Sequence, residues 1–266
     1  MEEDDVFLQT LAPRNIVGVH NYCDGWCERC GFADRCVVIA TVQKECPLPP
    51  GQDPLIDHLK DRFDQVRVLI ETRSTFNPAD LELDLDPPDA AERAKQDARR
   101  EKLGSHPLVR EAYCYWGLVR GWFEAETEGL RVHADALVQR ARSEDVEDLP
   151  LSSELARIVD SIDIVRWDSF LIVAKLRRAI DGCDDARDGS EDDPVQNDYN
   201  GSAKVALTVI DRSEGAWRSI DRWFPSSGGG VLLADQLAAL REAVEVEFPR
   251  ARAFLRPGFD GLVTPE

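Results

Sequence analysis

Four cysteines lie within fourteen residues near the start of the chain, with the spacing Cys23-x3-Cys27-x2-Cys30-x5-Cys36. Thiolates at such short spacings are suitable ligands for a soft metal ion or an iron–sulfur cluster. His20 stands just upstream and offers a nitrogen ligand or a hydrogen-bond donor to the site. We therefore expect residues 1–52 to form a cysteine-rich metal-binding segment, which ends in a proline-rich turn.

The composition restricts the classes of function. The chain carries 51 acidic and 32 basic residues, which gives a net charge of −19. A field of that sign repels phosphate groups, so we expect no nucleic-acid binding and no attachment to an anionic membrane. No uncharged apolar stretch approaches the length of about 18 residues that a transmembrane helix needs. With 43% hydrophobic residues, the chain can bury a core without help from a metal.

The first residues, MEEDDVF, are acidic, whereas a signal peptide starts with basic and then apolar residues. This favours a cytoplasmic location, where thiols stay reduced. A compact cysteine group in that compartment is typical of a metal or redox site rather than of a disulfide framework. The three scattered cysteines, Cys46, Cys114 and Cys183, are most simply structural thiols.

Apolar residues recur at helical spacing along most of the chain. We expect residues 53–105 to hold an amphipathic helix over 54–74 and an acidic linker. The end of the linker, residues 91–104, is expected to be an exposed helix or a tether. Four longer helices are expected over 108–142, 154–180, 202–224 and 231–248. Ser153 and Ser202 are the expected N-caps of the second and third, and Gly182 is the expected terminator of the second. The short apolar run 37–40 fits a strand or a helix.

Helices joined by modest loops favour an antiparallel bundle. The predicted fold is therefore mainly α, with residues 106–266 as the bundle and the cysteine-rich segment 1–52 docked on it as one integrated domain.

Charged residues interrupt the apolar pattern of the two central helices, and buried charges must be paired. Two interpretations stay open. The charges form either an interior polar site for a small substrate or a salt-bridge network that fixes helix register. The candidate site comprises Glu124, Asp163, Arg166, Lys204 and Asp211.

The run Cys27-Glu-Arg-Cys30-Gly-Phe-Ala-Asp-Arg-Cys36 resembles part of the [4Fe-4S] loop of the endonuclease III/adenine glycosylase family. That family's pattern is Cys-x6-Cys-x2-Cys-x5-Cys, and this chain matches its last three positions. His20 occupies the first position, and Cys23 lies three residues beyond it. The resemblance covers residues 20–36 and implies a [4Fe-4S] cluster whose fourth ligand is Cys23 or His20. It does not imply glycosylase activity, because the family's helix–hairpin–helix and catalytic residues are not recognisable.

These observations predict a metal-binding helical protein that works in electron transfer, redox sensing or cluster-stabilised recognition. Zinc is the alternative metal, although structural zinc usually takes two Cys-x2-Cys pairs and only Cys27 and Cys30 form one here. With zinc, the protein would be a non-enzymatic adaptor that binds another protein or a second copy of itself. An enzyme that uses the interior charges is a third possibility.

Overall fold

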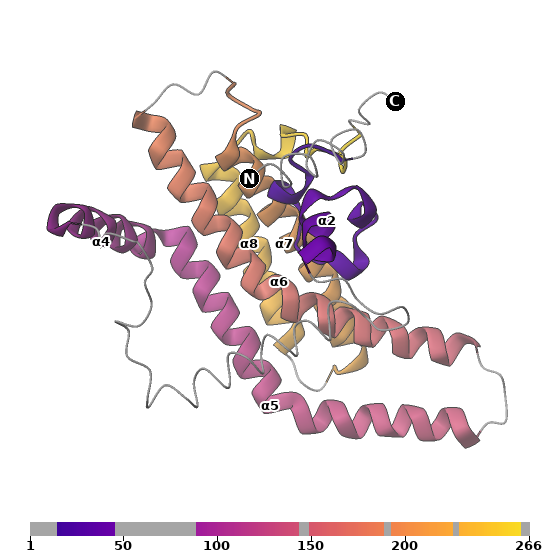
Figure 1. The fold of residues 1–266 in the computed structure, drawn as a ribbon. Helices are drawn as coiled ribbons and strands as arrows, with labels where there is room; N and C mark the ends of the chain where they lie inside the picture. Colours follow the sequence, from indigo (N-terminus) through magenta and orange to yellow (C-terminus); the bar gives the residue numbers. More distant parts are fainter. Residues whose placement is uncertain (1–14, 46–88, 144–148, 189–192, 226–228, 262–266) are drawn as a thin grey trace, which may run out of the picture. The chain divides into compact units, whose positions relative to one another are not determined.

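The computed structural model describes residues 15–45, 89–143, 149–188, 193–225 and 229–261 (Figure 1). These ranges contain helices and no strand. The α-helices are α2 (Val37–Glu45), α4 (Ala90–Ser105), α5 (Pro107–Ser143), α6 (Leu149–Asp188), α7 (Asp198–Trp223) and α8 (Gly229–Glu247). Short 3₁₀ helices are η1 (Val19–Tyr22), η2 (Cys27–Arg29), η3 (Ala33–Arg35) and η6 (Ala251–Ala253).

The chain forms two compact units. Among the described residues, the first unit contains 15–20, 25–45 and 89–96. The second contains the long helices together with four residues of the cysteine-rich segment, Asn21–Asp24. The two units divide between Gln96 and Asp97, within α4, whereas the predicted boundary at 105/106 lies at the end of that helix. The predicted boundary at 52/53 lies outside the described residues.

The second unit is a bundle of α5, α6, α7 and α8. Helix α6 packs against both α5 and α7, and α8 packs against both α7 and α5. Figure 1 shows α5 and α6 running side by side in opposite directions. Each helix contributes one apolar stripe to a single core, as its helical periodicity predicts. The mainly helical fold is thereby confirmed, and none of the helices in the described ranges is long and apolar enough to span a membrane.

Helices α4, α5, α7 and α8 begin and end close to the expected positions, but two local signals were misread. Helix α7 begins at Asp198, and its N-cap is Asn197, whose side-chain oxygen accepts a hydrogen bond from the Asn200 amide at 2.9 Å. Ser202, the expected cap, is instead fully buried within the helix. Asparagine is as good an N-cap as serine, so residue type alone does not separate the two positions.

Helix α6 is longer than expected at both ends. It begins at Leu149, before Ser153, and passes through Gly182 to Asp188. A helix tolerates an interior glycine at a cost of about 1 kcal/mol, which tertiary packing offsets. At Gly182 the neighbour is Tyr199 of α7, at 3.6 Å from where a β-carbon would lie. The run 37–40 lies in helix α2, and the predicted helix 54–74 lies outside the described residues.

The centre of the core contains an unusual polar pair among its aromatic rings. The indole N–H of Trp217 donates a hydrogen bond to the hydroxyl of Tyr115 at 2.9 Å, and both side chains are fully buried. Trp217 also packs edge-to-face on Trp122, with ring centroids 5.0 Å apart. Burial raises the pKa of Tyr115 well above its usual value, although hydrogen bonds with Trp217 and Ser213 oppose the shift. The phenol therefore remains neutral in the folded protein.

Replacing Tyr115 by phenylalanine should lower the free energy of unfolding by about 1–3 kcal/mol, because the buried Trp217 N–H loses its acceptor. The pH dependence should also change. Above pH of about 10 the unfolded chain ionises this tyrosine while the folded protein keeps it protonated. The stabilisation that the Tyr115 hydroxyl provides is therefore fully present below that pH and is lost as the pH rises above it. The difference in the free energy of unfolding between wild type and Tyr115→Phe should narrow accordingly.

Urea unfolding at neutral and alkaline pH measures both effects. Tyr113→Phe, an exposed position on the same helix, is the matched control and should change stability by less than about 0.5 kcal/mol. An equal loss in both variants would contradict the role assigned to the buried pair.

Candidate functional site

Three of the predicted cysteine ligands lie on two consecutive 3₁₀ turns. Cys27 begins η2 and Cys30 is its C-cap, with the Cys30 amide donating to the Cys27 carbonyl at 3.2 Å. Cys36 is the C-cap of η3 in the same arrangement, with its amide donating to the Ala33 carbonyl at 3.3 Å. The Ile16 amide donates to the Arg35 carbonyl at 3.0 Å, which joins the preceding residues to η3. The spacing Cys27-x2-Cys30-x5-Cys36 thus places Cys30 and Cys36 at the ends of two similar turns.

Two contacts involve the sulfur atoms of these turns. The Phe32 amide donates to the Cys30 sulfur at 3.4 Å, and the Cys27 thiol donates to the Gly25 carbonyl at 3.7 Å. Amide hydrogen bonds to sulfur stabilise the thiolate and tune metal centres that use it. Gly25 has φ of 69°, a left-handed conformation that a side chain disfavours, so this turn requires glycine.

The segment buries little apolar surface. Of residues 15–42, Ile16 and Val19 are buried, while η2 and η3 bury no residue. Small segments of this kind commonly depend on a metal or a disulfide for their order. The six cysteines that the structure describes are thiols rather than disulfides. The donor set therefore has the right chemistry for a thiolate-bound metal.

The side chains are not gathered into a finished site. Across the described ranges, no group of three or more His, Cys, Asp or Glu side chains is arranged to hold a metal ion. The metal ligands consequently remain a prediction from spacing and local backbone geometry.

The fourth cysteine, Cys23, belongs to the helical unit, where the backbone around it is fixed by side chains of α6. Trp167 donates from its indole nitrogen to the Asp24 carbonyl at 2.9 Å. Lys175 donates to the Asn21 carbonyl at 3.2 Å, and Arg178 donates to the same oxygen at 3.4 Å. Side chains from one helix therefore hold the backbone two residues before and one residue after Cys23.

Tyr22 anchors the same residues by its ring. Its hydroxyl donates to Asp198 at 3.2 Å, and its ring lies 4.7 Å from the ring of Phe254. Gly201 of α7 makes this possible, because a β-carbon there would come within 2.3 Å of the Tyr22 ring. Any larger residue at 201 would displace the segment next to Cys23.

A buried carboxylate completes the attachment. Asp168 of α6 is fully buried and accepts hydrogen bonds from Arg212 of α7, at 2.9 Å from Nε, and from the Ser213 hydroxyl at 3.0 Å. The same guanidinium donates to the Asp24 carboxylate at 2.7 Å. Burial opposes the charge of Arg212, but hydrogen bonds and charges from the two aspartates outweigh it and raise its pKa. Arg212 thus stays charged and bridges Asp168 to the residue after Cys23.

Lys175 lies close enough to Cys23 for their charges to interact. Burial lowers the pKa of Lys175, while a thiolate at Cys23 favours the charged ammonium.

The five residues predicted to form an interior polar site are dispersed. Three of them are exposed, which corrects the prediction: Glu124 pairs with Arg120 on α5 at 3.7 Å, Arg166 lies over the Phe123 ring, and Asp211 pairs with Arg252. Lys204 donates to the carbonyl of the same Arg252 at 2.7 Å, so Lys204 and Asp211 are brought near each other. Asp163 is half-buried on α6.

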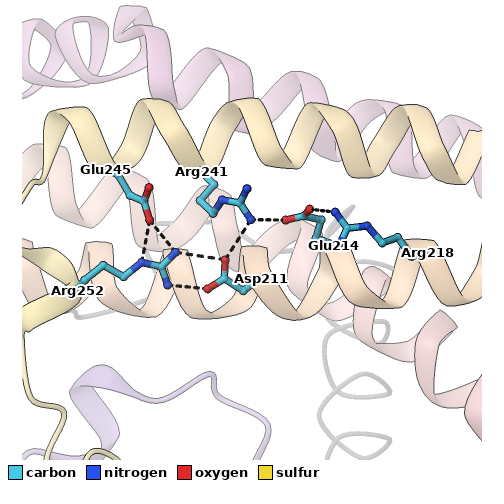
Figure 2. A network of polar contacts seen from close by, with 6 residues as sticks. All are labelled: Asp211, Glu214, Arg218, Arg241, Glu245 and Arg252. Atoms are coloured by element: carbon cyan, nitrogen blue, oxygen red, sulfur yellow. Dashed lines mark hydrogen bonds and ion pairs between the residues drawn. The ribbon is translucent and has the colours of Figure 1, made fainter.

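Asp211 is one member of a six-residue network between α7, α8 and η6 (Figure 2). Arg252 joins Asp211 at 2.6 Å to Glu245 at 2.9 Å, and Arg241 joins Asp211 at 3.8 Å to Glu214 at 2.6 Å. Arg218 pairs with the other oxygen of the buried Glu214. Figure 2 shows three carboxylates alternating with three arginines, so the network balances its own charge. This arrangement supports the alternative interpretation, a salt-bridge network that fixes helix register.

Sequence reasoning left the two buried carboxylates, Asp168 and Glu214, out of the candidate site. A signal for Asp168 was present, because it lies on the same helical face as Val165, Ile172 and Leu176, which are all buried. The partner Arg212 could not be found in this way, since it lies 44 residues away on another helix.

Comparison with known proteins adds no assignment. The chain matches no protein family, no curated protein and no solved structure.

Replacing Arg212 by leucine should lower the free energy of unfolding by about 3 kcal/mol, because it leaves the buried Asp168 without its cation. Amide hydrogen exchange at residues 21–24 should accelerate, since the Asp24 contact is lost as well. Arg131→Leu is the control, because Arg131 pairs with two carboxylates on the exposed surface of α5. Such pairs contribute little, so a loss of similar size in both variants would contradict the analysis.

Proposed function

We propose that residues 20–36 bind a [4Fe-4S] cluster and that the protein uses it in electron transfer, redox sensing or recognition of a partner. Cys27, Cys30 and Cys36 are the proposed ligands, and Cys23 or His20 supplies the fourth. The single observation that carries the proposal is the pair of consecutive turns on which Cys27, Cys30 and Cys36 lie. Their spacing is also that of the [4Fe-4S] loop that the segment resembles. A cluster would supply one-electron chemistry or structural rigidity.

The contacts of this chain's own residues support Cys23 rather than His20 as the fourth ligand. The backbone on both sides of Cys23 is hydrogen-bonded to α6, through Lys175, Arg178 and Trp167. A ligand whose backbone is already held in place needs little further ordering when it binds a metal.

The first test is metal and acid-labile sulfide analysis of protein purified without oxygen. We expect about four irons and four sulfides per chain, with a broad absorption band near about 400 nm that dithionite bleaches. Cys27→Ser should lose iron and colour, whereas Cys114→Ser, an exposed cysteine on α5, should retain both. One zinc in a colourless protein would replace this proposal by the zinc-stapled adaptor. Protein with neither metal would contradict both.

The second test separates the two candidates for the fourth ligand. We expect Cys23→Ser to lower iron content and change the absorption spectrum, and His20→Ala to leave both close to wild type. Retention of a normal spectrum in Cys23→Ser together with its loss in His20→Ala would assign His20 instead.

A further inference from the structure

The outer side of α5 and α6 carries a surface of aromatic rings and arginines, formed by Tyr113, Trp116, Arg120, Arg166, Phe170 and Arg177. Tyr113 and Phe170 are 40% and 59% exposed, which is high for large rings. The Trp116 ring lies 6.3 Å from Tyr113 on its own helix and 6.2 Å from Phe170 on α6. The three rings therefore form a continuous, partly exposed patch across both helices. We call the six residues the aromatic–arginine surface.

Each arginine of this surface lies against a ring. Arg177 donates to the Tyr113 hydroxyl at 3.0 Å, Arg120 lies 5.3 Å from the Trp116 ring centre, and Arg166 lies 4.4 Å from that of Phe123. Arg120 has a carboxylate partner in Glu124, but Arg166 and Arg177 form no ion pair with any described residue. In a chain with a net charge of −19, three arginines on one surface, two of them without an ion pair to any described residue, are unusual. Tryptophan, tyrosine and arginine are also the residues that most often dominate protein interfaces.

The outer face of α8 has the opposite character. Five exposed residues follow one another at intervals of three and four: Leu232, Asp235, Ala239, Glu242 and Val246. Leu232 is 71% exposed and Val246 is 81% exposed. Neither Asp235 nor Glu242 has an ion-pair partner among the described residues. This α8 acidic face is therefore an apolar and negatively charged stripe, of the kind that helices place in a complementary groove.

The two surfaces cannot meet within one molecule. The opposite side of α8 is buried in the bundle core through Leu233, Leu237, Leu240 and Val244. The acidic face must therefore point away from the other helices of its own bundle.

We infer that this protein self-associates by placing the α8 acidic face of one copy on the aromatic–arginine surface of another. The second copy supplies what this surface lacks, namely carboxylates for Arg166 and Arg177 and aliphatic side chains for the rings. The lengths of the two surfaces are similar, since Leu232 to Val246 spans about 21 Å of α8 and Arg166 to Arg177 spans about 16 Å of α6. The inference does not depend on the proposed cluster, because all these residues lie in the helical unit.

The test uses two charge-reversed variants of the full chain, Arg166→Glu/Arg177→Glu and Asp235→Arg/Glu242→Arg. The mass of each in solution is measured by light scattering and sedimentation over a range of concentrations. The wild type should associate, and less strongly at high salt, because ionic strength screens the charges. Each variant alone should associate at least tenfold more weakly. Circular dichroism and thermal unfolding confirm that both variants remain folded.

Mixing the two variants in equal amounts provides the decisive result. At one contact the acidic surface of the first variant then meets the basic α8 face of the second. At the other contact both partners carry their original charges. Association should therefore return toward the wild-type level. The control is Val132→Glu, an exposed position on α5 outside the surface, which should leave association unchanged. A wild type that stays monomeric up to about 1 mM would overturn the inference. So would a mixture that associates no better than the separate variants.

Discussion

The ion pair between Asp168 and Arg212 is the interaction on which the arrangement around Cys23 depends. A fully buried carboxylate is unstable unless it is paired, and here the pair joins α6 to α7. The guanidinium has further donors, and it uses one of them on Asp24. The same charge that stabilises the core thus also fixes the residue next to a predicted metal ligand. Loss of the pair would therefore affect both the bundle and the segment attached to it.

The remaining charges of the bundle have a different role. The network of Figure 2 is balanced in sign and joins α7 to α8 and η6, which sets how these elements lie along one another. It contains no carboxylate left without a cation. These charges are thus already paired with one another, so we look for the chemistry in the cysteine-rich segment, as proposed above. The turns η2 and η3 bury no residue, so apolar packing on its own does not account for their order.

The outer faces of the bundle helices differ in chemical character. The bundle presents cations and rings on α5 and α6, and carboxylates and aliphatic side chains on α8. Apolar residues on a helix usually face inward, and here both outward faces keep large ones. The two proposals therefore use different parts of the chain: the cysteine-rich segment for the cluster and the outer faces of the bundle for self-association.

The sequence by itself determined the mainly helical fold and the place of most of the long helices along the chain. Periodic apolar residues predict α5 and α8 to within two residues at each end, whereas α7 begins four residues before the expected cap. The agreement follows because the buried stripe of a helix repeats with the helical period. Local signals were less reliable: Gly182 did not end α6 and Ser202 did not cap α7, since tertiary packing overrides weak local preferences. Glu124, Arg166 and Asp211 were wrongly expected in the interior because apolar residues stand next to them in the sequence. A charged residue between apolar ones can still point outward on a helix.

Only the tertiary structure decided which charges meet. Arg212 pairs with residues 44 and 188 positions away, and a helical pattern contains no information about partners on other helices. It equally decided that Asn21–Asp24 belong to the helical unit, through contacts with α6 and α7. The physical reason is the same in both cases. Periodicity records which side of a helix is buried, whereas the pairing of buried charges depends on how helices pack against one another.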